Sequence, residues 1–219
     1  MAGVTTAPAA DAAPRSARRA APPSDAPSRG FAALATLASL AVAAAWALGL
    51  DWGVIRAGLK TFVSDAHAVP GRFNLFNYRG ATLIADYGHN PDAIEALSRA
   101  VEKMPANKRS VVISGAGDRR DEDIREQTVI LGAAFDDVIL YQDAAQRGRA
   151  DGEVMALLRE GLAGAPRTTH VEEIRGEFIA IDAALARLQP GDLCLVLVDQ
   201  VEEALAHLAQ RCTEGETTA

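Results

Sequence analysis

From residue 72 to residue 211, short apolar runs alternate with longer stretches in which apolar residues recur every three or four positions. A short run bounded by turn residues is typical of a strand, and the longer period is typical of an amphipathic helix. The first two runs, at residues 72–78 and 81–86, are separated only by Arg79-Gly80, which predicts a hairpin.

The alternation then continues without a visible internal repeat. It predicts a helix that opens at Pro91 and ends before Pro105, strands at residues 110–114, 138–141, 169–173 and 193–198, and helices at residues 121–134, 152–162, 178–188 and 201–211. Strands that alternate with helices form βαβ units. We therefore expect an α/β fold with a Rossmann-like, mostly parallel sheet covered by helices.

Two positions test this pattern in detail. In the helix at 121–134 the inward face includes Ile124 and Leu131, and either Thr128 or Val129 completes it. Cys194 falls inside the most apolar strand, so we expect a small buried side chain there.

The first 50 residues do not follow this alternation. Residues 1–30 contain ten Ala and five Pro with no apolar periodicity, which predicts a disordered leader. Residues 31–50 carry no charge and are long enough to span a bilayer, but nine of them are Ala, which contributes little transfer free energy. A single N-terminal transmembrane helix or signal segment therefore stays open, although we favour an Ala-rich helix buried in a soluble, cytoplasmic protein.

Composition sharpens this division. The full chain of 219 residues has a net charge of −7, but the leader carries +2, so residues 51–219 carry −9. An acidic surface argues against nucleic-acid and anionic-membrane partners. We divide the chain into a leader (1–30), an Ala-rich helical segment (31–66) and one α/β domain (70–212).

Three loops follow predicted strands and carry residues suited to binding. In a parallel sheet, ligands bind at the carboxyl ends of strands. The first loop places Asp86, His89 and Asn90 near the start of a helix, where an anion or a nucleotide oxygen is favoured. A simple capping turn, with Asn90 as the N-cap, explains the same residues.

The second loop is Gly-rich and includes Gly115, Gly117, Asp118, Arg119 and Arg120. Its glycines allow close approach of a ligand, and its arginines suit a carboxylate or a phosphate. A solvated turn with local Asp–Arg pairs is the competing interpretation.

The third loop carries Arg147 and Arg149, which also suit anions, although a flexible basic loop is the simpler interpretation. Asp199, at the end of the last strand, could face the same cleft or cap the last helix.

Several kinds of chemistry have no motif in the sequence. Two cysteines and four histidines form no metal-ligand spacing, so we predict no metal site, and no GxSxG or GxxxxGK[ST] motif occurs. We therefore assign no catalytic residue. The residues alone predict a nucleotide- or anion-binding α/β domain.

The sequence also resembles a known family. Residues 86–93 (DYGHNPDA), preceded by Pro70-Gly71-Arg72-Phe73 and followed by a Gly-Asp-Arg loop, resemble the C-terminal domain of the Mur ligase superfamily. Within that superfamily, residues 110–123, 141–153 and 198–202 are similar to the cyanophycin synthetase family. The similarity covers roughly residues 43–211.

The resemblance implies an ATP-dependent amide ligase that activates a carboxylate as an acyl phosphate. In this family the product is a polyaspartate backbone carrying arginine, and ATP acts with Mg²⁺. The resemblance places Arg72, Asp86, His89 and Asn90 on the nucleotide side, and it places Gly115, Gly117, Asp118, Arg119 and Arg120 toward the amino acid. Self-association of the chain stays open.

The departures from the family also lead to expectations. The family's central domain carries a phosphate-binding loop that this sequence does not contain, and residues 43–62 resemble the last helices of that domain. We therefore expect a fragment, from a truncated or frameshifted reading frame, that binds ATP only weakly and has no ligase activity alone. A non-catalytic nucleotide- or amino-acid-binding module, anchored in a membrane through residues 31–50, is the alternative.

Overall fold

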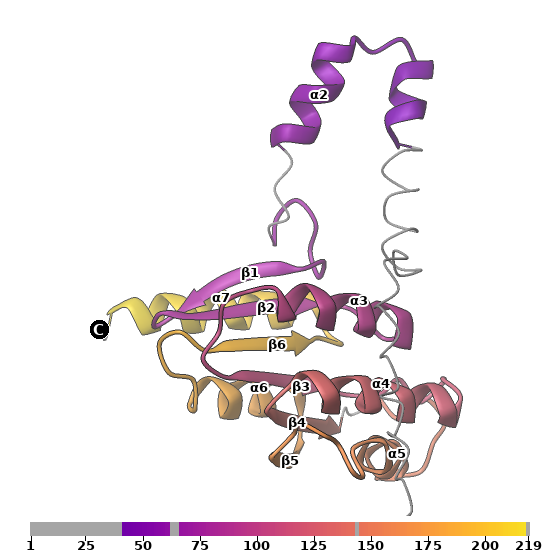
Figure 1. Ribbon diagram of the computed structural model, residues 1–219, viewed down its shortest axis with the longest axis vertical. Coiled ribbons are helices and arrows are strands. Elements are labelled where there is room, and N and C mark those ends of the chain that lie inside the picture. The colour runs from indigo at the N-terminus through magenta and orange to yellow at the C-terminus, as the bar shows by residue number, and fades with distance from the viewer. Residues whose placement is uncertain (1–40, 62–65, 143–144, 218–219) are drawn as a thin grey trace, which may run out of the picture.

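The computed structural model describes residues 41–61, 66–142 and 145–217. Its centre is a six-stranded sheet in the order β1-β2-β6-β3-β4-β5 (Figure 1). Only β1 is antiparallel to its neighbour, and β2, β6, β3, β4 and β5 run parallel. The strands are β1 (Asn74–Tyr78), β2 (Ala81–Asp86), β3 (Arg109–Ile113), β4 (Asp137–Gln142), β5 (His170–Arg175) and β6 (Leu193–Leu197).

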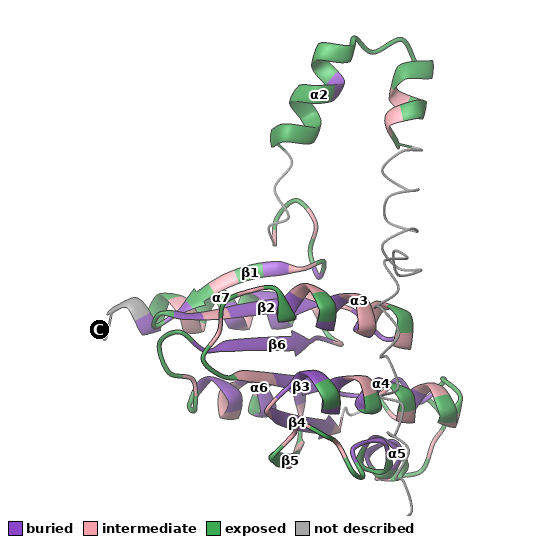
Figure 2. Ribbon diagram, viewed as in Figure 1, coloured by how far each residue is buried: buried purple, intermediate pink, exposed green. Residues whose placement is uncertain are grey.

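Helices cover both faces of this sheet, which gives three layers. One face packs against α3 (Pro91–Glu102), α4 (Asp121–Ala134) and α5 (Glu153–Gly161), and the other against α6 (Glu177–Leu185) and α7 (Val201–Thr217). Because successive side chains of a strand point to opposite faces, β6 supplies Leu193, Leu195 and Leu197 to the first core and Cys194 and Val196 to the second. All five are fully buried, as expected for a central parallel strand (Figure 2).

This architecture confirms the predicted fold class. The Arg79-Gly80 turn joins β1 and β2 with both residues in the left-handed region, at φ 50° and 81°, as a tight hairpin requires. Thr128, not Val129, completes the inner face of α4: Thr128 is fully buried and Val129 is 55% exposed. Cys194 is buried, and burial raises the pKa of its thiol to about 11.

Most predicted boundaries differ from the structure by one to three residues. Strand β1 begins at Asn74 rather than residue 72, β5 covers residues 170–175 rather than 169–173, and α6 ends at Leu185 rather than residue 188. The largest difference is α7, which continues six residues past the expected end at residue 211.

The segment before the domain differs from the expected continuous buried helix. Residues 41–47 are helical, the chain turns at Gly49 with φ 82°, and α2 (Trp52–Thr61) follows as a second helix (Figure 1). The side chain of Asp51 accepts a hydrogen bond from the Gly53 N–H at 2.7 Å and so helps to start α2.

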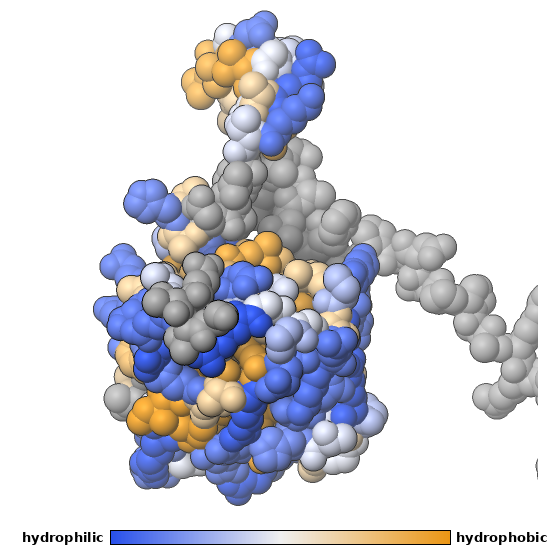
Figure 3. Space-filling view, turned by 90° about the vertical axis from the view of Figure 1, so that its left-hand side faces the viewer, coloured by the Kyte–Doolittle hydropathy of each residue, from blue (hydrophilic) through white to orange (hydrophobic). Residues whose placement is uncertain are grey.

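This helical hairpin is not buried within the described part of the chain. Trp46 is 70% exposed and Leu48 is 83% exposed, and Trp52, Val54 and Leu59 are each at least half exposed. Figure 3 shows apolar side chains on one side of the hairpin and polar ones on the other. In residues 41–61, 66–142 and 145–217, no helix combines the length and apolar character that a membrane crossing needs. The leader and residues 31–40 lie outside these ranges.

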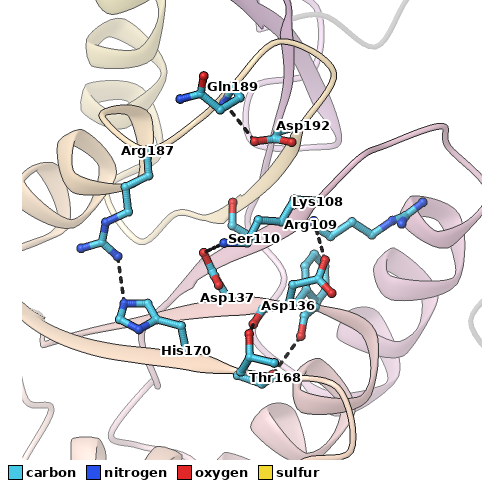
Figure 4. Close-up of polar contacts among 12 residues, drawn as sticks. Lys108, Arg109, Ser110, Asp136, Asp137, Thr168, His170, Arg187, Gln189 and Asp192 are labelled. Carbon is cyan, nitrogen blue, oxygen red and sulfur yellow. Dashed lines mark hydrogen bonds and ion pairs between the residues drawn. The ribbon is translucent and has the colours of Figure 1, made fainter.

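Polar side chains gather at the amino edge of the sheet (Figure 4). The Lys108 ammonium lies 2.6 Å from one carboxylate oxygen of Asp137, a residue that is only 7% exposed. Next to it, Asp136 accepts hydrogen bonds from the Arg109 N–H and from two nitrogens of Arg167. These contacts fix the entry of the chain into β3 and β4 and lie at the opposite edge from the predicted binding loops.

The outer strand β5 pairs with β4 and with no other described strand. It is the most exposed of the six strands, and its adjacent Glu172 and Glu173 lie between exposed Val171 and half-buried Ile174. Arg187 pairs with Glu172 and Arg159 pairs with Glu173, so both carboxylates are tied to residues of the neighbouring helical layers.

Candidate functional site at the carboxyl edge of the sheet

The loops predicted to bind a ligand meet at the carboxyl edge of the sheet. Strand β6 lies between β2 and β3, and β3 lies beside β4, so the segments that follow these four strands are neighbours. Arg147, from the loop after β4, links three of these strands: its guanidinium lies 2.9 Å from Asp199 Oδ1 after β6 and 3.4 Å from Asp118 Oδ1 after β3. Partial burial opposes the charge on Arg147, but the Asp199 carboxylate, a hydrogen bond with the Tyr87 side chain and the Asp118 carboxylate together outweigh it and raise the pKa of Arg147.

His89 lies beside this ion-pair cluster and is 7% exposed. Its ring packs edge-on against Tyr87, with 4.2 Å between centroids, and its backbone carbonyl accepts a hydrogen bond from Gln127 at 3.2 Å. Neither ring nitrogen has a hydrogen-bond partner among the described residues, and Nε2 lies 3.7 Å from Asp199 Oδ1.

The His89 imidazole is neutral at pH 7. Burial lowers its pKa to about 4, and the positive charges of Arg147, Arg119 and Arg72 add to that effect. The 3.7 Å approach to Asp199 is therefore a contact of a neutral ring rather than an ion pair. A neutral imidazole offers one N–H donor and one acceptor to a ligand.

Asp86 directly precedes Tyr87, and Arg72 contacts Tyr87. The Asp86 carboxylate accepts a hydrogen bond from the Phe73 N–H at 2.8 Å. Burial raises the pKa of Asp86, although that hydrogen bond and the charge of Arg72 act in the opposite direction. Arg72 donates to the Tyr87 carbonyl at 3.2 Å and lies over its ring, so these two contacts hold the cation next to Tyr87.

Asn90 has the capping role that the sequence offered as an alternative. Its side-chain oxygen accepts a hydrogen bond from the Ala93 N–H at 2.9 Å at the start of α3. The oxygen is therefore committed to the helix, and the amide NH₂ is the part of Asn90 that a ligand would meet.

The Gly-rich loop is packed tightly by the chain itself. A Cβ at Gly117 would lie 2.2 Å from the Gln146 carbonyl oxygen, and one at Gly115 would lie 2.7 Å from a Val154 methyl group. The two glycines thus have a packing reason in the structure, whether or not a ligand approaches them.

Arg149 braces the same loop from the next one. It donates to the carbonyls of Gly117 and Arg119, both at 2.7 Å, and pairs with Asp121 and Glu153. The charge of Arg149 is engaged within the chain, so its role here is to hold the two loops together.

The three polar residues after the glycines diverge. Asp118 faces Arg147, and Arg119 is close enough to lower the pKa of His89. Arg120 instead pairs with Asp123 on the first turn of α4 at 2.6 Å and is largely exposed. The predicted local Asp–Arg pair therefore describes Arg120, while Asp118 and Arg119 belong to the cluster around His89.

Sequence reasoning did not find two residues that support this edge. Glu177, at the start of α6, accepts hydrogen bonds from the backbone N–H groups of Asp199 and Gln200. Gln127, on α4, is 1% exposed and holds the loop of His89. One signal in the sequence could have identified Gln127: it is a polar residue on the inward face of the predicted helix at residues 121–134.

The donor set around His89 suits an organic ligand. Within the described residues, no group of three His, Cys, Asp or Glu side chains gathers closely enough to hold a metal. Two carboxylates, two arginines and a buried imidazole without hydrogen-bond partners instead suit a ligand that carries both charges and hydrogen-bonding groups.

The fold and the site define a class of protein: an α/β module with a charged cluster at the carboxyl edge of a parallel sheet. The family model "Mur ligase, glutamate ligase domain" matches residues 71–198, and the chain belongs to this family. Cyanophycin synthetases of Crocosphaera subtropica and a Synechocystis species are 34% and 35% identical over 168 residues, which is 77% of this chain and 19% of each relative. The chain thus spans about a fifth of the length of these curated relatives.

Solved structures share this fold. Escherichia coli FolC in complex with ADP, without folate substrate, superposes with a TM-score of 0.58 at 24% identity and covers 83% of this chain and 40% of its own. A second FolC structure, with DHPP and ADP, has a TM-score of 0.57 at 26% identity. The part of the chain covered by this match is longer than residues 66–217, because it is 83% of 219 residues. The match therefore includes residues that precede the sheet domain.

Proposed function

We propose that the chain is the C-terminal module of an ATP-dependent amide ligase of the cyanophycin synthetase type. In this reaction a polymer carboxylate attacks the γ-phosphate of ATP, which gives an acyl phosphate and ADP. The amine of arginine then attacks the acyl carbon, which forms the amide bond and releases phosphate. The observation that carries the proposal is the charged cluster around Arg147 and His89, in a domain about one third identical to cyanophycin synthetases.

The cluster divides into two parts with different chemistry. On the nucleotide side, Arg72 and the Asn90 amide are donors toward phosphate or base, and buried neutral His89 offers a donor and an acceptor. Asp86 braces the loop that carries them through the Phe73 N–H. ATP would bind here with Mg²⁺, which supplies charge neutralisation of its phosphates.

On the amino-acid side, Asp118 and Arg119 are an anion and a cation on adjacent residues, as a zwitterionic substrate needs. Arg120 points to α4 and contributes less directly, and Gly115 and Gly117 shape the loop. A second copy of the chain is not needed for this division.

The chain alone is expected to be inactive. ATP-dependent ligation needs a loop that cradles the β- and γ-phosphates, and the sequence contains no GxxxxGK[ST] motif. A partner domain must supply it. The exposed apolar side of the helical hairpin, with Trp46, Leu48 and Trp52, is the surface on which we expect that domain to dock.

The test combines binding with activity. Incorporation of labelled arginine into a polyaspartate primer is measured for the chain alone, for a cyanophycin synthetase lacking its C-terminal domain, and for their mixture. We expect incorporation only in the mixture, and less of it with Asp118→Asn. No incorporation in the mixture, together with no calorimetric signal from Mg·ATP or arginine on the chain, would count against the proposal.

A further inference from the structure

Glu177 is a buried carboxylate at the carboxyl edge of the sheet. It is the first residue of α6 and is 2% exposed. Its Oε1 accepts a hydrogen bond from the Asp199 N–H at 2.9 Å, and its Oε2 accepts from the Gln200 N–H at 3.1 Å and from the Gln200 side chain at 3.3 Å.

Its surroundings favour the ionised form. Glu177 lies in the first turn of α6, and Gln200, whose carbonyl accepts the Ala204 N–H at 2.8 Å, directly precedes α7. The carboxylate therefore stands at the N-termini of two helices, where the partial positive charge of the helix dipole stabilises an anion. Each of its oxygens accepts a backbone N–H, which compensates for the lost hydration.

These hydrogen bonds fix the residue that completes the ion-pair cluster. Asp199 carries both the N–H held by Glu177 and the carboxylate that meets Arg147 at 2.9 Å and approaches His89 to 3.7 Å. With the amides of residues 199 and 200 both held, the backbone that aims the Asp199 side chain has little freedom.

We propose that Glu177 is a positioning residue of this site, which acts through the loop after β6 to aim Asp199 at Arg147 and His89. Glu177 itself does not touch the ligand. Its relevance to ligation rests on the proposed function, whereas its effect on Asp199 and His89 does not.

Replacing a buried acid that has only a structural role would lower the stability of the protein without changing the site. Asp192 is the matched control, because it is 8% exposed and its carboxylate accepts the Gln189 N–H at 2.9 Å, but at the amino edge (Figure 4). Glu177→Gln replaces one acceptor oxygen by a donor and so loses one of the two backbone hydrogen bonds. Glu177→Asp keeps the charge at both helix N-termini but reaches less far.

The experiment is an NMR titration of the His89 ring in the intact chain and in the variants Glu177→Gln, Glu177→Asp and Asp192→Asn. In the intact protein we expect a pKa of about 4. Release of the loop moves the Asp199 carboxylate away, which lowers the proton affinity of His89, and it admits water, which raises that affinity. Burial is the largest cause of the low pKa, so the second effect is the larger one. In both Glu177 variants the proton affinity of His89 should therefore rise about tenfold, toward the ordinary value of about 6.5. Asp192→Asn should leave the proton affinity of His89 unchanged, although this variant should unfold at a lower urea concentration than the intact chain.

Two results would overturn the inference: His89 titrating as in the intact chain in the Glu177 variants that fold, or shifting equally in Asp192→Asn. If Glu177→Gln does not fold, Glu177→Asp decides by the same criterion. Affinity for Mg·ATP and arginine is measured separately on the intact chain. Absence of both, together with no arginine incorporation in the mixture, would count against the proposed function, while the titration would still decide the role of Glu177.

Discussion

Lowering the pH from 7 to 4 should destabilise the folded chain through His89. The folded state holds the ring neutral with a pKa of about 4, whereas an unfolded chain takes up a proton near pH 6.5. Between these values the unfolded state binds more protons, so the free energy of unfolding falls as the pH falls. The stability is complete above about pH 6.5, and the loss is complete below about pH 4.

The size of the effect follows from the pKa difference. A shift of roughly 2.5 units corresponds to about 3 kcal/mol, because each unit is about 1.4 kcal/mol. Asp86 acts in the opposite direction, since its raised pKa makes the folded state take up a proton more readily than the unfolded state as the pH falls. Arg167 helps to lower the pKa of Asp136, and Arg211 helps to lower that of Asp182. The stability that these two carboxylates contribute is lost only at more acidic pH.

The assay is urea denaturation followed by circular dichroism at half-unit steps from pH 7.5 to pH 4, with His89→Gln as the control. The intact chain should lose about 2–3 kcal/mol over this range. His89→Gln, which cannot titrate, should lose much less between pH 6.5 and pH 5. If the two proteins show the same pH dependence, the assignment of a buried, neutral His89 is wrong.

Three further changes test other parts of the structure. Gly117→Ala should lower stability by about 1–3 kcal/mol in thermal unfolding, because its Cβ would meet the Gln146 carbonyl at 2.2 Å; an unchanged Tm would contradict that packing. Leu158→Ala removes a fully buried side chain and should cost about 2–5 kcal/mol by urea unfolding, and a cost below about 1 kcal/mol would show a poorly packed core. Arg147→Met removes the charge that most lowers the pKa of His89 after burial, so an NMR titration should find that pKa higher, and a lower one would refute the electrostatic account.

Periodicity was sufficient to predict the sheet and its helices because each core-facing element is buried in a regular way. Leu193–Leu197 is apolar at every position since both of its faces are covered, and Pro91 marks the start of α3. The ends of the helices and strands are predicted less accurately than their presence, because terminal turns depend on tertiary contacts. The extension of α7 past residue 211, for example, is accompanied by the pair of Arg211 with Asp182, 29 residues away in the chain, which no local pattern reveals.

The site was partly predictable for a similar reason. Strand ends can be read from the sequence, so the sequence predicts that the loops of His89, Asp118 and Arg147 lie at one edge of the sheet. The contacts between them could not be predicted, because Arg147 and Asp199 are 52 residues apart in the chain and meet only through the strand order. Glu177 was missed because a Glu at the first position of a helix is ordinary in sequence, and its hydrogen bonds go to residues 199 and 200, more than 20 positions away.

The charged outer strand also bears on how the molecule meets its neighbours. A strand with one open side is a template for pairing with another chain, and such pairing can lead to aggregation. On β5, a strand added in this way would lie alongside Glu172 and Glu173, whose carboxylates are engaged with Arg187 and Arg159. An incoming strand would have to accommodate these four charges in a drier environment, which is costly. The charged edge thus disfavours the addition of another strand, and the exposed apolar hairpin is the more favourable surface for association.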